Sequence, residues 1–500
     1  MKRNRLFRVV IPILLFSVLG FLVMGYHPGA EDDGIYLSAI KADLNPSLYP
    51  FNAGFFTLQM KASVFPNCMA EFIRASHIPI AWSELLWQWI SIVLILWGCW
   101  SIVSQLFEET AARWAGLATV AAMFTLPVAG TALFIVDQYL HPRALATAMI
   151  LFAASRILAD KSWQALPFGF LAMVAHPLMG ILGVSFCCVL GMTRSVSVRD
   201  CQESFSSPRG AEREAAPVLA MIPFGWIFDP PSPTWLEALR SRHWFRLYQW
   251  EWYEWLGAIA PLAIFWLVAR MAKKCGETKL ARLATAIWIY GVFQMAVAMV
   301  ILGPQRLIGL STLEPMRFLH LIYVFMALIG GAYLGKYLLK ARAWRWALFL
   351  LLANGGMLLA QRQLFPASDH LELPGMNSAN PWLQAFDWIR NNTPKDAYFA
   401  VDPKYMAAPG EDYHSFRALA ERSQLADAIK DTSVVTKVPE LGPDWKLQLE
   451  AEDGWANFKL ADFERLKMQF GVSWVLVAYP PPDGLDCRWH NDALSVCQVP

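Results

Sequence analysis

Three consecutive acids, Glu31, Asp32 and Asp33, are the residues of this sequence best suited to chemistry. They stand in the stretch HPGAEDDGIY, residues 27–36, directly after an apolar run over residues 9–26. Ionisable groups at a membrane boundary are costly to place there, and by default they indicate function. A carboxylate can accept a proton, and partial burial raises its pKa towards the working pH. The structural alternative is a solvated loop that caps a helix.

The composition places these acids in a membrane protein. Of the 500 residues, 56% are hydrophobic and only 16% are charged, whereas soluble domains carry about a quarter charged residues. The apolar residues gather in runs of roughly 17–25, which is long enough to cross a bilayer as helices. The runs stop near Pro366. The net charge of +2 gives no case for nucleic-acid binding.

The apolar runs and the basic turns between them predict about 11 transmembrane helices. Basic residues at positions 2, 3, 5 and 8 place the N-terminus in the cytoplasm, and no small-x-small cleavage site ends the first run, which indicates an uncleaved anchor. The run 163–192 is long for one crossing and is interrupted at His176-Pro177, so two short helices should meet there. The predicted spans are 9–26, 84–107, 114–136, 143–158, two within 163–192, 218–228, 256–271, 284–302, 316–334 and 346–360.

These spans divide the chain into two expected domains. Residues 1–365 should form a transmembrane domain that includes the first outside loop, 27–83. Residues 366–500 should form an extracytoplasmic α/β domain, because helix patterns at 380–390 and 463–470 alternate with strand patterns at 397–401, 472–478 and 494–499. We therefore expect an integral protein of the inner or plasma membrane, with its C-terminal domain in the periplasm or outside the cell.

The order of elements resembles the GT-C glycosyltransferases, a class of multi-spanning enzymes that includes oligosaccharyltransferases and protein mannosyltransferases. A basic N-terminus, one span and an acidic first outside loop follow one another, and Asp33-Gly34 with Tyr36 is similar to the acid motif of that loop in the family. The stretch W…WIRNNTP before a strand resembles the tails of several members. The resemblance implies sugar transfer from a polyprenyl-phosphate donor at the outer face, with Asp33 as the favoured catalytic residue beside Asp32 and Glu31.

A lipid-phosphate donor needs cations, because negative charge builds on the phosphate as the sugar leaves. Arg317 and His320 are three residues apart and share a helix face near the outer boundary. Arg317 is the favoured anchor, since its planar guanidinium offers phosphate two hydrogen bonds. His176, Arg306 and Arg143 are further candidates. The structural alternatives are snorkelling for the arginines and backbone carbonyls freed at the helix break for His176.

Asp137 lies in the second predicted outside turn, close to His141 and Arg143. The resemblance implies that some relatives carry a further acid there, which helps to bind Mg²⁺ or Mn²⁺ through oxygen ligands. Asp137 is therefore the candidate metal ligand, although it is a lone acid and not one of a pair. Its structural alternative is a helix cap.

The sequence has eight cysteines, and the predicted topology places only Cys68, Cys487 and Cys497 outside. Cys487 and Cys497 flank Arg-Trp-His-Asn-Asp in a hairpin-like spacing, and an oxidising compartment permits a disulfide between them. Two unrelated thiols are the alternative. A zinc site that uses His490 is less favoured, because no second pair of ligands accompanies it.

Two other classes of function stay open. One is a transporter or lipid flippase. Two observations disfavour it: the polar groups gather at one face, and no inverted repeat is evident. The other is a non-catalytic relative that keeps the bundle for binding or scaffolding. The expected partners are membrane lipid and the polyprenyl-phosphate donor, and the sequence names no protein partner, sugar or acceptor.

Overall fold

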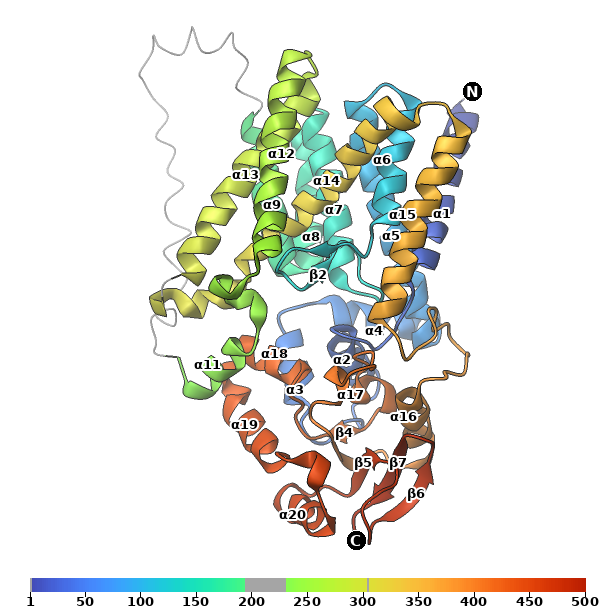
Figure 1. Ribbon diagram of the computed structural model, residues 1–500, viewed down its shortest axis with the longest axis vertical. Coiled ribbons are helices and arrows are strands. Elements are labelled where there is room, and N and C mark those ends of the chain that lie inside the picture. The colour runs from blue at the N-terminus through green and yellow to red at the C-terminus, as the bar shows by residue number, and fades with distance from the viewer. Residues whose placement is uncertain (1, 194–230, 304) are drawn as a thin grey trace.

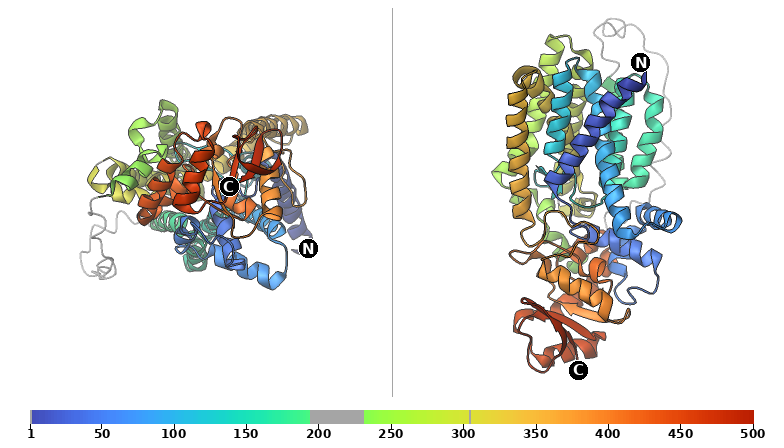
Figure 2. Two further views of the ribbon diagram at one scale, coloured as in Figure 1. Left: turned by 90° about the horizontal axis from the view of Figure 1, so that it is seen from below. Right: turned by 90° about the vertical axis from the view of Figure 1, so that its right-hand side faces the viewer.

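Long apolar helices form one end of the molecule and a β-sheet forms the other (Figure 1). The computed structural model describes residues 2–193, 231–303 and 305–500, without the side chains of residues 2–6, 305 and 306. The N-terminus lies at the far end of the helical bundle, and the C-terminus lies at the opposite end, beside the sheet (Figure 2). A middle layer of short helices separates the two.

The bundle presents large apolar side chains on its outside, among them Leu15, Phe170 and Leu351. An apolar surface of this extent indicates contact with lipid. Six described helical stretches are long and apolar enough to cross a membrane: Phe7–Met24, Ile80–Leu106, Trp252–Lys274, Thr278–Leu302, Leu307–Leu339 and Ala343–Leu364. The bundle helices are α1 (Lys2–Met24), α5 (Ile80–Leu106), α6 (Thr110–Ala122), α7 (Pro142–Leu158), α8 (Leu166–Ala175), α9 (Pro177–Met192), α12 (Trp252–Lys274), α13 (Thr278–Leu302), α14 (Leu319–Leu334) and α15 (Ala343–Leu364).

The predicted count of about 11 spans stays a prediction. Helices α6, α7, α8 and α9 are shorter than the six long candidates. The predicted span 218–228 and the basic residues 194–213 lie outside the described residues.

The predicted break at His176 is confirmed as a helical hairpin. Helix α8 ends at Ala175 and α9 begins at Pro177. The two helices run back along each other, because a Cβ on Gly180 would meet the Met173 backbone at 2.5 Å and a Cβ on Gly169 would meet Val184 at 3.3 Å. Glycine at 180 therefore permits the close approach of the two helices next to the turn.

The middle layer consists largely of the first loop, residues 27–83. This loop packs on the C-terminal tail, residues 366–500, as well as on the bundle. Phe51 stacks on Tyr398 with ring centroids 4.6 Å apart, and the Asn52 amide donates to Gln448 Oε1 at 2.7 Å. The proposed domain boundary at residue 365 thus separates segments that share contacts through this loop. The described elements of the middle layer are α2 (Asp33–Leu44), α3 (Gly54–Met60) and α4 (Phe65–Ser76) from the first loop, together with α11 (Pro233–Arg240), β1 (Pro127–Val128) and β2 (Leu133–Phe134).

The tail contains a five-stranded sheet in the order β4-β3-β5-β7-β6. Strand β3 pairs parallel to β4 and β5, whereas β5, β7 and β6 are antiparallel. All four residues of β3 are buried, as expected of a strand covered on both faces. The strands are β3 (Tyr398–Val401), β4 (Ser423–Gln424), β5 (Trp474–Ala478), β6 (Asp486–His490) and β7 (Leu494–Gln498); the helices are α16 (Pro381–Asn392), α17 (Phe416–Ala420), α18 (Lys430–Lys437), α19 (Gly442–Ala451) and α20 (Leu460–Phe470).

The three strands and two helices predicted in the tail are confirmed as β3, β5, β7, α16 and α20. A disulfide joins Cys487 on β6 to Cys497 on β7. The two residues face each other in the register of these strands, so the bridge ties the edge strand β6 to the sheet.

Candidate functional site

The turn that carries the acids is held by backbone hydrogen bonds on both sides. The Tyr26 N–H donates to His370 O at 3.1 Å, and the Glu31 N–H donates to Tyr413 O at 3.0 Å. Glu31 adopts the left-handed conformation, with φ of 51°. The segments after α15 and before α17 thereby fix the direction in which each of the three acids points.

Asp33 points into the protein. Only 2% of Asp33 is exposed, and its Oδ2 accepts the Gly29 N–H at 2.6 Å. Burial raises the pKa of Asp33 to about 7, although the Gly29 hydrogen bond and the charge of Lys41 oppose this rise. A carboxylate in this position holds the turn and offers no face to a substrate. The geometry therefore argues against Asp33, the favoured catalytic residue of the sequence analysis.

The raised pKa of Asp33 predicts that stability depends on pH. The folded state holds this proton more tightly than the unfolded chain, whose aspartates titrate near about 3.9, so the free energy of unfolding should fall as pH rises from about 4 to 7. Asp33→Asn keeps the shape and removes the titration. Thermal unfolding in detergent should show that the melting temperature falls less between about pH 5 and about pH 8 for the variant than for the wild type. Identical losses would contradict this account.

Asp32 points the other way, and 36% of its side chain is exposed. The Lys430 ammonium donates to Asp32 Oδ1 at 3.3 Å and also pairs with Glu31. Desolvation alone would raise the pKa of Asp32, but Lys430, His141 and Arg143 together outweigh it and hold the pKa well below its usual range. Asp32 is thus an ionised and partly exposed carboxylate.

His141 lies beside Asp32 and caps helix α7. Its Nδ1 accepts the Arg143 N–H at 3.0 Å, so the proton of the neutral ring is on Nε2, which lies 3.8 Å from Asp32 Oδ2. The Arg143 side chain turns away to Asp137, with Nη2 2.7 and 2.6 Å from the two carboxylate oxygens. Arg143 Nη1 is buried without a partner among the described residues.

His176 caps α9 in the same manner, since its Nδ1 accepts the Met179 N–H at 3.3 Å. Its ring lies on that of His141, with centroids 5.6 Å apart and planes at 25°. The N-termini of α7 and α9 therefore meet next to Asp32. The positive ends of the two helix dipoles make this place favourable for anions.

Lys430 reaches the acids from the tail, where it begins helix α18. Arg417 makes a buried double hydrogen bond with Asp431, with Nη1 and Nη2 each 2.7 Å from a carboxylate oxygen. Asp431 Oδ2 also accepts the Asp427 N–H at 2.9 Å. This pair fixes the loop that presents Lys430 to the bundle.

Further cations lie near the acids, on two other segments and at the far end of α18. Glu314 is buried and pairs with Arg317 and with Lys437, whose ammonium lies 2.9 Å from Glu314 Oε1. Arg317 keeps 15% of its side chain exposed. Arg242, from the segment between α11 and α12, donates to Ile429 O. The negative charge of Asp32 favours the protonated, positive form of both Lys437 and Arg242.

Of the two remaining predicted phosphate ligands, His320 and Arg306, only His320 has a described side chain. His320 is buried, and its Nε2 donates to Ile135 O at 3.0 Å, so the ring is committed to the loop around β2. Residues 315–318 form a 3-10 turn before α14 begins, and Arg317 and His320 both line one small cavity. The Arg306 side chain lies outside the described residues.

The residues around Asp137 do not fit a divalent cation. Both carboxylate oxygens of Asp137 accept hydrogen bonds from Arg143, so a metal would have to displace a buried ion pair. The positive charges of Arg143, Arg317 and Lys437 around the same space would also repel it. The Mg²⁺ or Mn²⁺ site expected at Asp137 is not supported by this geometry.

A protein-family model described as a domain of unknown function (DUF6798) matches residues 380–432, from the start of α16 to just past Lys430. No curated protein matches the chain significantly. Among solved structures, the chain is similar to the oligosaccharyltransferase AglB of the archaeon Archaeoglobus fulgidus in complex with an inhibitory peptide and a dolichol-phosphate. The two are 11% identical with a TM-score of 0.45, over 94% of this chain and 69% of that one. It is also similar to the oligosaccharyltransferase of that organism in complex with Zn and sulfate, at 12% identity and a TM-score of 0.43, over 94% and 68% of the two chains. A likeness of this extent carries no argument about the activity of this chain.

Proposed function

We propose that this chain is a membrane glycosyltransferase of GT-C type, which moves a sugar from a polyprenyl-phosphate donor to an acceptor on the side of the membrane where the tail lies. The observation that carries this proposal is Asp32, an ionised and accessible carboxylate where bundle, first loop and tail meet. Cations from the bundle and from the tail surround it. A loop that merely caps a helix needs no such convergence of distant segments.

The donor phosphate binds where the N-termini of α7 and α9 meet Arg317, Lys430 and Lys437. Arginine and lysine donate charge-assisted hydrogen bonds to phosphate oxygens, and the two helix ends add the positive ends of their dipoles. The same groups stabilise the negative charge that grows on the phosphate as the bond between the sugar and its oxygen breaks. The polyprenyl chain then lies along the apolar outside of the bundle.

Asp32 serves the acceptor in this proposal. Before the donor binds, Lys430 and His141 hold the pKa of Asp32 low. A phosphate draws on the same cations, so their hold on Asp32 weakens and its affinity for a proton rises. As the acceptor nucleophile attacks the sugar and the sugar–phosphate bond breaks, Asp32 takes the proton that the nucleophile loses. No step requires a divalent cation.

Lys430→Met tests the phosphate site, with Lys404→Met as the matched control. Both lysines lie in the tail segment 380–432, but Lys404 is exposed and, unlike Lys430, forms no ion pair with Glu31 or Asp32. Loss of a hydrogen bond to a charged group costs about 1.5–3 kcal/mol, so Lys430→Met should weaken the binding of polyprenyl phosphate by roughly tenfold or more. Titration of the detergent-solubilised proteins with polyprenyl phosphate measures this. Equal affinities of the two variants would refute the proposed phosphate site.

A further inference from the structure

A second group of chemically capable side chains lies at the base of the acid turn and plays no part in the proposed transfer. Among the described residues, His27, Glu372 and His414 offer ligand atoms that all lie within 4.8 Å of one another. The three come from different segments: His27 follows α1, Glu372 follows α15, and His414 precedes α17. Any ion bound here would fasten the bundle to the tail.

The backbone holds these three residues in place. Tyr26 pairs with Leu371 in a parallel bridge, so the next residue of each segment, His27 and Glu372, is brought together. His414 pairs with Ala30 in an antiparallel bridge on the other side of the turn. The His27 ring also stacks on Phe365, with centroids 3.8 Å apart and planes at 8°, which fixes the orientation of its nitrogens. The cluster is thus arranged by the fold and not by flexible surface chains.

The side chains converge on the Glu372 carboxylate. His27 Nδ1 lies 2.8 Å from Oε1, and His414 Nε2 lies 3.0 Å from Oε2. Both histidines are buried, and within the described part of the chain His27 Nε2 and His414 Nδ1 have no hydrogen-bond partner. These outer nitrogens point away from Glu372, so they need supporting partners, such as water or a carboxylate, whether or not an ion is bound.

Asp412 supplies a further sign of a metal site. It stands two residues before His414, and its Oδ2 is buried without a partner in the described structure. A histidine bound to a metal usually donates its other ring N–H to a carboxylate or carbonyl. His414 Nδ1 and Asp412 Oδ2 are a donor and an acceptor of that kind, both unused.

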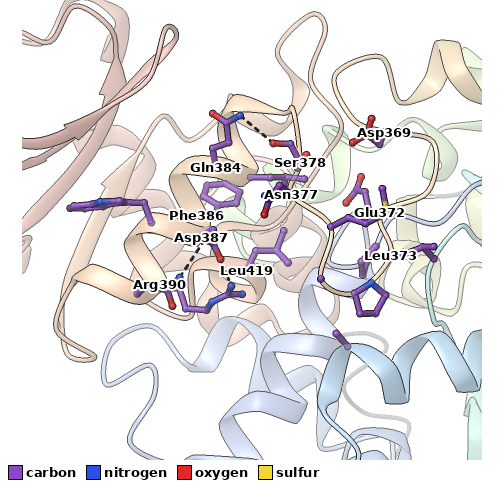
Figure 3. A pocket seen from close by; sticks show the side chains of 18 of the residues that line it. Asp369, Glu372, Leu373, Asn377, Ser378, Gln384, Phe386, Asp387, Arg390 and Leu419 are labelled. Atoms are coloured by element: carbon purple, nitrogen blue, oxygen red, sulfur yellow. Dashed lines mark hydrogen bonds and ion pairs between the residues drawn. The ribbon is translucent and has the colours of Figure 1, made fainter.

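We propose that His27, Glu372 and His414 bind a divalent transition-metal ion, and that the ion is zinc. Two imidazoles and one carboxylate are a zinc ligand set that leaves one position for water. Tetrahedral ligands at about 2.0–2.1 Å from zinc stand about 3.3 Å from one another, so the Glu372 oxygens must move slightly away from the histidine nitrogens that they now contact at 2.8 and 3.0 Å. Glu372 lines a cavity of about 640 Å³ between residues 369–378 and α16, and in this proposal water from that cavity supplies the fourth ligand (Figure 3). The inference is independent of the proposed sugar transfer, because none of the three residues contacts Asp32.

The test uses the full chain in detergent, first stripped with a chelator and then dialysed against Zn²⁺. Metal analysis should find about one tightly held zinc per chain in the wild type, and Zn²⁺ should raise its melting temperature where Mg²⁺ at the same concentration does not. Glu372→Gln and His414→Gln should lose both responses. His370→Gln is the matched control, since His370 lies two residues from Glu372 and its ring bonds Leu22 O at 2.8 Å. This control should keep both responses.

Asp412→Asn tests the site without removing a ligand, in case the ligand variants fail to fold. Loss of a carboxylate that supports a metal ligand should weaken zinc binding by about 10–100-fold. A wild-type protein that neither retains zinc nor gains stability from it would overturn the proposal and leave a hydrogen-bonded triad. Loss of zinc in His370→Gln as well as in the ligand variants would place the metal elsewhere, and would equally overturn it.

Discussion

Asp32→Asn should lower the rate of sugar transfer by about 10²–10⁴, which is the usual cost of removing a general base. The substitution keeps the size of the side chain and removes its charge and its proton-accepting oxygen. Because 36% of the Asp32 side chain is exposed and no core packing depends on it, expression and thermal stability should stay close to wild type. Transfer in isolated membranes, from polyprenyl-phosphate-linked sugars to acceptors, measures the effect.

Glu31→Gln and Asp33→Asn are the matched controls, since they change the neighbouring carboxylates in the same turn. Glu31 shares Lys430 with Asp32, so Glu31→Gln should have a small effect. Asp33 is buried and faces Gly29, so Asp33→Asn should change the pH dependence of stability more than the rate. Wild-type activity in all three variants would mean that the acids only form a solvated loop. Loss of transfer in Asp33→Asn alone would restore the assignment made from the Asp-Gly-x-Tyr pattern.

Arg417→Met should destabilise the protein by about 3–5 kcal/mol, because removing one partner of a buried ion pair leaves the other charge uncompensated. Asp431 would keep its carboxylate among buried groups with only the Asp427 N–H as a charge-stabilising donor. The carboxylate of Asp431 also raises the pKa of the Arg417 guanidinium above its usual range, despite burial. Denaturant unfolding of the full chain, followed by tryptophan fluorescence, gives the free-energy difference.

Arg488→Met is the control for this effect. Arg488 pairs with Asp486 on the exposed strand β6, where both side chains are 54% exposed. Exposed pairs contribute only about 0–1 kcal/mol, so Arg488→Met should unfold close to wild type. Similar, small losses for both variants would show that the Arg417–Asp431 pair contributes little to stability. In that case this pair could not be what fixes the loop that carries Lys430.

Much of the fold could be predicted from the sequence, because membrane helices and buried strands leave strong local patterns. The apolar runs marked the bundle, and the His176-Pro177 break in a run of thirty residues marked the α8–α9 hairpin. In the tail, the apolar stretch 472–478 marked β5. These patterns depend on neighbouring residues only, so one sequence is enough to find them.

The direction of each acid could not be predicted, because it depends on contacts with distant segments. Adjacent residues Asp32 and Asp33 end on opposite sides of the turn, since the left-handed Glu31 and the bond to Tyr413 set the start of α2. A short motif identifies the turn but not which of its acids is open to substrate. For the same reason the sequence analysis missed Lys430, which stands almost four hundred residues after the acids it pairs with.

Arg143 and His320 illustrate a second limit. Both are polar residues near a membrane boundary, which made them candidate phosphate ligands. Arg143 is occupied by Asp137, and His320 by the Ile135 carbonyl, so each satisfies a local buried group. One signal that was available is the His-Pro pair at both 141–142 and 176–177, where histidine caps a helix that proline begins. The two caps bring α7 and α9 to the same point.

The most direct test of the account is a structure of the protein in lipid with a non-hydrolysable polyprenyl-phosphate sugar bound. We predict phosphate density within hydrogen-bonding distance of Lys430 and Arg317, in front of the N-termini of α7 and α9, with the sugar between the phosphate and Asp32. Density for the ligand along a path through the middle of the bundle would contradict the account and favour transport. Phosphate bound only at the lipid headgroup level, away from Asp32, would contradict it as well.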